Sequence, residues 1–100
     1  MRIMYTADAL RDLEGVLLYI AARNSTASIR AAARVRMAIS HIALFPNASR
    51  LDRETGVREY VVSDLPILVT YQVYDNHVKI VAIFHTAQDL SSKRRGMPGT

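Results

Sequence analysis

Three short apolar runs, rich in residues that favour strands, follow one another between Gly56 and Asp89. They read VREYVV, PILVTYQVY and HVKIVAIFH, and turn residues separate them, SDLP first and then Asp75-Asn76. The short second turn predicts a tight antiparallel hairpin. Because both faces of the last two runs are largely apolar, we expect them in the interior of a sheet that is covered on both sides.

A first segment with helical periodicity precedes these runs. Thr6 is a candidate N-cap, and the acidic residues just after it complement the helix dipole. The apolar residues that repeat at helical spacing predict one buried stripe, made of Leu10, Leu13, Leu17 and Ile20.

A second helix is predicted from Ala27 to Leu44, with Ser25 or Thr26 as its cap. It ends before Pro46, because the residue that precedes a proline avoids helical dihedrals. Two antiparallel helices joined by a short polar turn make a helical hairpin. The residues expected on the buried side of the second helix are Ile29, Ala32, Val35, Ile39 and Ile42.

The remaining segments complete an expected fold class. Residues 2–5 predict a first strand, and residues 47–56 predict a polar loop. The fold class is therefore α+β, in the order β-α-α-β-β-β, with a helical hairpin packed on a small, mainly antiparallel sheet. One hundred residues predict one domain, for which we expect residues 1–90, and a flexible basic tail at residues 91–100.

Composition limits the classes of function. The formal charge is +4, with eleven Arg against two Lys, which suggests an acidic partner, either nucleic acid or an acidic protein segment. The alternative is solvated surface charge. The absence of Cys fits a cytoplasmic protein, and no targeting or membrane segment is visible. His41 and His77 have no carboxylate or histidine at ligand spacing, so we expect neither a metal nor a cofactor. His77 is expected to be exposed in the hairpin turn.

Four features in this order resemble the RelE/ParE superfamily of toxins from type II toxin–antitoxin systems, and the ParE branch most. The first two features end the two helices, Tyr19-Ile20-Ala21 the first helix and Phe45-Pro46 the second. The third is Arg58-Glu59, which opens a strand that leads to Pro66 and then Tyr71. The fourth is His85, three residues after Ala82, with Asp89 soon after. The resemblance spans residues 2–90. It implies the β-α-α-β-β-β fold and a small antitoxin that wraps the toxin. It also implies a complex that is a heterotetramer or larger and meets operator DNA only through the antitoxin.

The superfamily contains two chemistries. RelE-like members cleave messenger RNA in the ribosomal A site, whereas ParE-like members, which include plasmid-stabilisation proteins, poison DNA gyrase. RelE-like nucleases are expected to carry arginines where this chain has Leu68 and Gln88, and a tyrosine in a tail that here has none after Tyr74. Each missing cation would remove about 3 kcal/mol of transition-state stabilisation. We therefore expect a gyrase inhibitor that acts by binding rather than an enzyme. The alternative is a RelE-like endonuclease that uses Arg58, His85 and Arg94.

The residues expected to contact the target or the antitoxin are Arg58, Tyr71, His85, Lys93, Arg94 and Arg95. Each also has a structural interpretation. His85 could hydrogen-bond at the sheet end, Arg58 could form a cross-strand salt bridge with Glu59, and Tyr71 could belong to the core. The basic tail could simply be solvated. A third possibility is a chain that has lost toxicity and represses its own operon together with its antitoxin.

Overall fold

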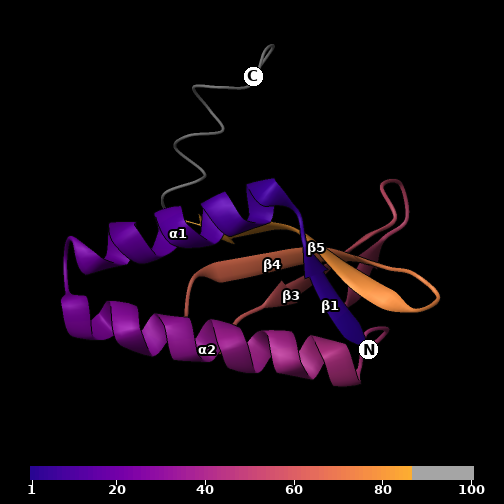
Figure 1. Cartoon of the computed structure of the whole chain (residues 1–100), viewed down its shortest axis with the longest axis horizontal. Helices are drawn as coiled ribbons and strands as arrows, with labels where there is room; N and C mark the ends of the chain where they lie inside the picture. Colours follow the sequence, from indigo (N-terminus) through magenta and orange to yellow (C-terminus); the bar gives the residue numbers. More distant parts are fainter. Residues whose placement is uncertain (87–100) are drawn as a thin grey trace, which may run out of the picture.

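The computed structural model describes residues 1–86, which form two helices and five strands. Figure 1 shows the helices side by side, joined by a short turn at one end of the molecule. In chain order the elements are β1 (Arg2–Tyr5), α1 (Ala7–Ala21), α2 (Ser25–Leu44), β2 (Arg50–Asp52), β3 (Val57–Val61), β4 (Ile67–Val73) and β5 (His77–His85).

The strands form one sheet in the order β1-β5-β4-β3-β2. Every neighbouring pair is antiparallel except β1 with β5, which confirms the expected α+β fold. The prediction of an uninterrupted loop over residues 47–56 was wrong, because β2 lies inside it. Gly56 has φ of 73° and its N–H donates to the Asp52 carbonyl at 2.8 Å, so a tight turn folds β2 back onto β3. β2 has only three residues, and they are mostly polar, so the sequence shows no alternation of apolar and polar residues that would predict a strand there.

β4 and β5 form the predicted hairpin at the centre of the sheet. The Tyr74 N–H donates to the His77 carbonyl at 2.9 Å across the turn. His77 was expected to be exposed in that turn. Instead it begins β5, is half-buried, and stacks on Tyr74 with ring centroids 4.8 Å apart. A β-bulge interrupts the pairing at Thr70 and Tyr71 and adds local twist.

α1 begins where the sequence predicts, and Leu13, Leu17 and Ile20 of the predicted stripe pack against the core. Thr6 caps the helix, since its hydroxyl oxygen accepts a hydrogen bond from Ala9 N–H at 2.9 Å. The same hydroxyl donates to the Val81 carbonyl of β5. The Asp12 carboxylate also joins the helix to β5, since it accepts a hydrogen bond from Ile83 N–H at 3.1 Å. Ala9 and Val16 are fully buried, whereas Leu10, expected in the stripe, is 54% exposed.

α2 also differs in its cap and in its buried side. Asn24, rather than Ser25 or Thr26, is the N-cap, because its side-chain oxygen accepts from Ala27 N–H at 3.0 Å. Ile29 was expected in the core and is 74% exposed. Small residues take its place against the rest of the molecule, where they allow close packing. The buried residues of α2 are Ala31, Val35, Ala38, Ile39 and Ile42.

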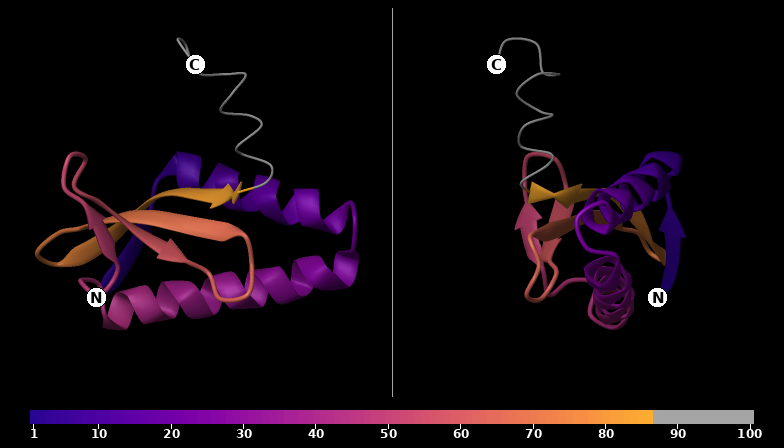
Figure 2. Two further views of the ribbon diagram at one scale, coloured as in Figure 1. Left: turned by 180° about the vertical axis from the view of Figure 1, so that it is seen from behind. Right: turned by 90° about the vertical axis from the view of Figure 1, so that its left-hand side faces the viewer.

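Both helices lie on one side of the central strands, as the two views of Figure 2 show. Between these layers lies the core, whose largest fully buried side chains are Tyr71, Ile42, Ile67, Ile80 and Ile83. Within residues 1–86 the opposite face of the sheet has no helix over it. The expectation that both faces are covered is therefore met on one face only in the described part of the chain.

Candidate functional site

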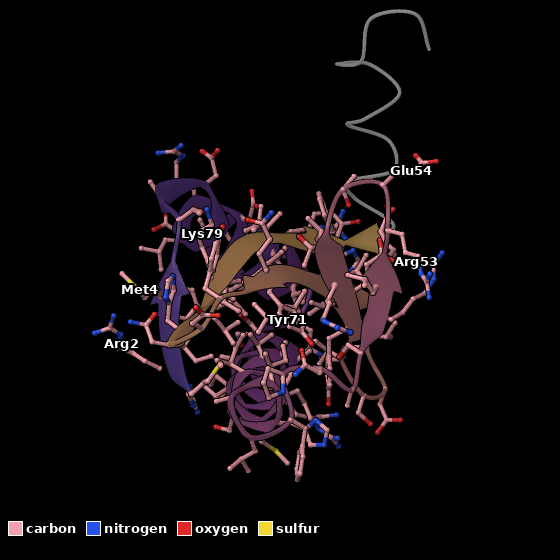
Figure 3. All side chains as sticks on the ribbon, turned by 90° about the vertical axis from the view of Figure 1, so that its right-hand side faces the viewer. Arg2, Met4, Arg53, Glu54, Tyr71 and Lys79 are labelled. Atoms are coloured by element: carbon pink, nitrogen blue, oxygen red, sulfur yellow. The ribbon has the colours of Figure 1, made fainter. Side chains whose placement is uncertain are left out.

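Arg58 and Tyr71, two predicted contact residues, lie opposite each other on β3 and β4. Tyr71 is fully buried and points into the layer between the sheet and α2 (Figure 3), where its hydroxyl donates to the Pro46 carbonyl at 2.8 Å. The Arg58 guanidinium donates to the carbonyls of Asn47 and Ser49 at 3.1 and 2.8 Å. Both side chains therefore hold the segment that leaves α2, the tyrosine through its hydroxyl and the arginine through one nitrogen of its guanidinium.

His85 lies at the other end of the sheet, in a stack of rings with the last turn of α1. The side chain is 8% exposed, and its ring centroid is 4.9 Å from that of Tyr19. The Arg23 guanidinium lies over Tyr19, 3.8 Å from the ring centroid, and donates to the Tyr19 carbonyl. Cation–π contact of this kind is favourable. Sequence reasoning missed this cluster, because only the fold brings the end of α1 beside the end of β5.

The structure does not bring Arg58 and His85 together. His85 pairs with Ile67, and Arg58 pairs with Tyr71, four residues further along β4. At 3.3 Å per residue the two positions are about 13 Å apart along the strand. The other predicted positions, among them Gln88 and Asp89, lie outside the described residues, as do Lys93, Arg94 and Arg95.

The sheet face turned away from the helices carries an apolar row. Val61 pairs with Leu68, and Leu68 pairs with Phe84, so the three side chains lie on the same face. Val61 is 70% exposed, and the other two are half-buried. Leu68 occupies the position where a RelE-like nuclease is expected to have an arginine. We call Val61, Leu68 and Phe84 the sheet row.

A pair of charged groups lies on the same face of β3 as Val61. Glu59, two residues from Val61 on β3, lies opposite Arg50 on β2, and their side chains form an ion pair at 2.6 Å. The sequence offered Arg58 as the partner of Glu59. The structure assigns that role to Arg50, because Arg58 and Glu59 point to opposite faces of the strand.

A second apolar surface lies on α2, and sequence reasoning did not identify it. Ile29, Met37 and Leu44 are 74, 65 and 72% exposed on the side of the helix that faces away from the core. Ala33 lies between them at helical spacing, and Phe45 continues the surface beyond the helix end. We call these five residues the α2 stripe. The sequence signal was present, since α2 has apolar residues around most of its circumference.

Residues 1–86 offer neither a candidate metal site nor a helix that could span a membrane. No group of three or more His, Asp or Glu side chains in this range is placed to hold a metal ion. Burial raises the pKa of the Tyr5 phenol on β1 above its ordinary value. Neither α1 nor α2 is long and apolar enough to cross a membrane.

The fold and the order of these elements agree with known proteins. A family model described as the ParE toxin of the type II toxin–antitoxin system parDE matches residues 3–90. The chain belongs to the ParE toxin family. Membership implies an antitoxin as partner, as the resemblance predicts.

Two curated toxins and one chain of a solved structure are similar to this chain. "Putative toxin Y4kP" of Sinorhizobium fredii is 32% identical over 87 residues, which are 87% of this chain and 90% of the relative. "Toxin RelE2" of Caulobacter vibrioides is 36% identical over 87 residues, covering 87% and 97% of the two chains. A chain in the solved structure of the chromosomal ParDE system from P. aeruginosa matches with a TM-score of 0.75 and 19% identity, over 83% of this chain and 92% of that one. The last comparison supports the fold.

Proposed function

We propose that this chain is a toxin that inhibits DNA gyrase by binding it, and that a cognate antitoxin neutralises it. The observation that supports binding over catalysis is the sheet row, where the position of an expected catalytic arginine holds Leu68, between Val61 and Phe84. This proposal places the protein in the cytoplasm with gyrase. It also gives the chain a role in plasmid stabilisation.

The electrostatics of the sheet row argue against phosphodiester cleavage there. Cleavage of RNA without a metal needs cations that stabilise the charge of the phosphorane, and groups that move protons to and from the reacting oxygens. On β3, Glu59 lies on the same face as Val61 and is paired with the Arg50 guanidinium. Because the two charges neutralise each other, this pair supplies no net positive charge to attract RNA phosphate.

The same row suits contact with a protein. Exposed apolar side chains on a sheet lose water-accessible area when a partner covers them, and this burial is the main favourable term in association. Arg58 and Tyr71 would support such contact indirectly, because they fix the segment next to the sheet rather than meet the target themselves. The basic residues Lys93, Arg94 and Arg95 remain candidates for contact with an acidic surface.

The second candidate function is ribosome-dependent cleavage of messenger RNA. The relative named Toxin RelE2 favours it. The stack of Arg23, Tyr19 and His85 also favours it, since it places an imidazole and a guanidinium within one cluster. In this case His85 would move a proton, and Arg58 and Arg94 would be the expected cations.

One pair of assays separates the two functions. The purified chain, released from its antitoxin, is titrated against gyrase in a supercoiling assay and, in parallel, against translating ribosomes with a labelled message. The proposal expects inhibition or trapped DNA cleavage that saturates at a fixed ratio of toxin to gyrase, with the message intact. Codon-specific cleavage at substoichiometric toxin, abolished by His85→Gln, would instead establish the nuclease. If the chain shows neither activity and does not arrest growth, the non-toxic repressor becomes the best account.

A further inference from the structure

A cavity of about 160 Å³ lies between the middle of α2 and the β3–β4 turn. Figures 1 and 2 show these two segments against each other. The side chains that line the cavity come from α2, from β3 and from the turn, and they are Arg34, Met37, Ala38, His41, Tyr60 and Ser63. We call this hollow the α2–β3 cavity.

The polar groups of the α2–β3 cavity are open to a ligand. The Tyr60 hydroxyl, the Ser63 hydroxyl and the His41 imidazole form no hydrogen bond within residues 1–86. No side-chain oxygen or nitrogen of this range is buried without a partner, so these groups face solvent. Tyrosine, serine and histidine side chains can each donate a hydrogen bond to an oxyanion.

Arg34 supplies a positive charge to the cavity. Its guanidinium lies 3.4 Å from the Asp64 carboxylate of the β3–β4 turn, which is longer than a hydrogen bond between charged groups. The Asp64 side chain is 76% exposed, so water competes for this pair. Asp64 therefore holds the guanidinium beside the cavity and leaves most of its N–H groups available. Arginine can bind a phosphate through two parallel hydrogen bonds.

These donors are fixed in place before a ligand arrives. Tyr60 stands on β3 and packs against the core. The turn that carries Ser63 is closed by a hydrogen bond from Val62 N–H to the Ile67 carbonyl at 2.9 Å. Asp64 completes this turn with φ of 64°. Side chains on such fixed elements lose little conformational entropy when a ligand binds.

The size of the cavity selects the part of a ligand that can enter. At ~30 Å³ for each water molecule, it has room for about five waters, which suits a phosphate group and little more. A larger groove of about 610 Å³ adjoins it, because Met37 and His41 line both hollows. The His41 ring lies against Phe45 and Tyr60, with centroids 5.1 and 5.6 Å away. A flat aromatic group attached to the phosphate can therefore pack against His41 in the groove.

The charges around both hollows favour an anion. Arg34 lines the cavity and Arg36 lines the groove, and neither hollow is lined by an Asp or Glu of the described residues. Asp64, the partner of Arg34, is the carboxylate that opposes an anion here.

We propose that the α2–β3 cavity and the groove beside it bind a nucleoside monophosphate. The phosphate fills the cavity and accepts hydrogen bonds from Arg34, Tyr60 and Ser63. The base packs against the His41 ring and the Met37 side chain in the groove. This site is separate from the sheet row, and the proposal does not depend on gyrase as the target.

Titration of the full chain with adenosine 5′-monophosphate tests the assignment. Calorimetry should show saturable binding with a Kd below ~1 mM. Adenosine, which lacks the phosphate, and inorganic phosphate, which lacks the base, should each bind at least ~10-fold more weakly, since each fills only one of the two hollows. The absence of saturable binding, or equal affinity for the nucleotide and for inorganic phosphate, would overturn the proposal.

Substitutions around the phosphate position identify the site. Arg34→Gln and Tyr60→Phe should each weaken nucleotide binding about 10-fold, because each removes a donor to the phosphate. Arg53→Gln and Tyr74→Phe are the matched controls, since both side chains are exposed and line neither hollow, and they should leave the affinity unchanged. Unchanged affinity in both Arg34→Gln and Tyr60→Phe would contradict the proposal.

A gain in affinity is expected at the opposing carboxylate. Asp64→Asn removes the group that competes for Arg34, so nucleotide binding should become about threefold tighter. Asparagine tolerates the left-handed backbone at this position. Weaker binding in this variant would mean that the ion pair builds the site, against the proposal.

The unmodified chain provides a test that no folding defect can imitate. His41 lines both hollows, whereas His77 begins β5 at the other end of the sheet hairpin. In an NMR titration, adenosine 5′-monophosphate should shift the ring resonances of His41 and leave those of His77 in place. Equal shifts at both rings, or none at His41, would show that the nucleotide does not occupy the α2–β3 cavity.

Discussion

Two exposed apolar surfaces of this molecule differ in the charges around them. The α2 stripe is flanked by Arg30 and Arg36, which form no ion pair within residues 1–86, whereas the sheet row lies beside the neutralised pair of Arg50 and Glu59. Apolar area alone would predict that either surface binds any partner. The flanking charge gives each surface a preference, so that one molecule can meet an acidic antitoxin and a separate target at different places.

The largest effect is expected from Tyr71, which is buried beneath both surfaces. Tyr71→Ala should lower the free energy of unfolding by about 3–5 kcal/mol, because it leaves a cavity in the core and releases the Pro46 carbonyl. Urea denaturation measures this. Tyr74→Ala, at an exposed position, should change stability by less than about 1 kcal/mol. If the two variants were equally stable, the core would not be the common support of the two surfaces.

The next effect separates the surfaces from each other. Leu68→Arg puts a charge into the sheet row and should weaken binding to gyrase about 30-fold, as for a hot-spot residue, without changing antitoxin affinity. Met37→Glu should show the opposite pattern. Calorimetric titration against each partner gives both numbers. Loss of both affinities in either variant would mean that the two surfaces form one site.

A smaller effect is expected where the segment after α2 meets the sheet. Arg58→Met removes two hydrogen bonds to the carbonyls of Asn47 and Ser49 and should cost about 1–2 kcal/mol of stability. Thermal unfolding checks this, with Arg53→Met at the exposed β2–β3 turn as control (Figure 3). Toxicity should then fall only as far as the folded fraction does. Full stability with lost toxicity would make Arg58 a direct contact residue.

The smallest effect concerns the ion pair beside the sheet row. Arg50→Gln should change stability by less than about 0.5 kcal/mol, because the Arg50 side chain is mostly exposed and water screens the pair. The unpaired Glu59 should then reduce any affinity of this face for RNA. Tighter binding to an RNA oligonucleotide, measured by fluorescence anisotropy, would contradict the electrostatic account of the sheet row.

Much of the fold could be predicted from local patterns. The cap at Thr6, the turn at Asp75-Asn76 and the end of α2 before Pro46 each depend on neighbouring residues in the chain. The candidate site was harder to predict from the sequence. Tyr71 and Arg58 were recognised as important residues, but their hydrogen bonds to residues 46–49 join segments more than eight residues apart. No local pattern encodes such a contact.

The sequence by itself determined the order and type of the main elements, the two central strands and the surplus of arginine. Only the tertiary structure decided which side of each helix is buried, that residues 50–52 pair as a strand, and that His85 meets Tyr19. The physical reason lies in the range of the forces. Capping, turns and periodicity act within a few residues. The side of α1 that is buried depends instead on contacts with β5, which lies far away in the chain and is joined to Thr6 and Asp12 by hydrogen bonds. Ile29 is exposed because the opposite side of α2 packs in the core.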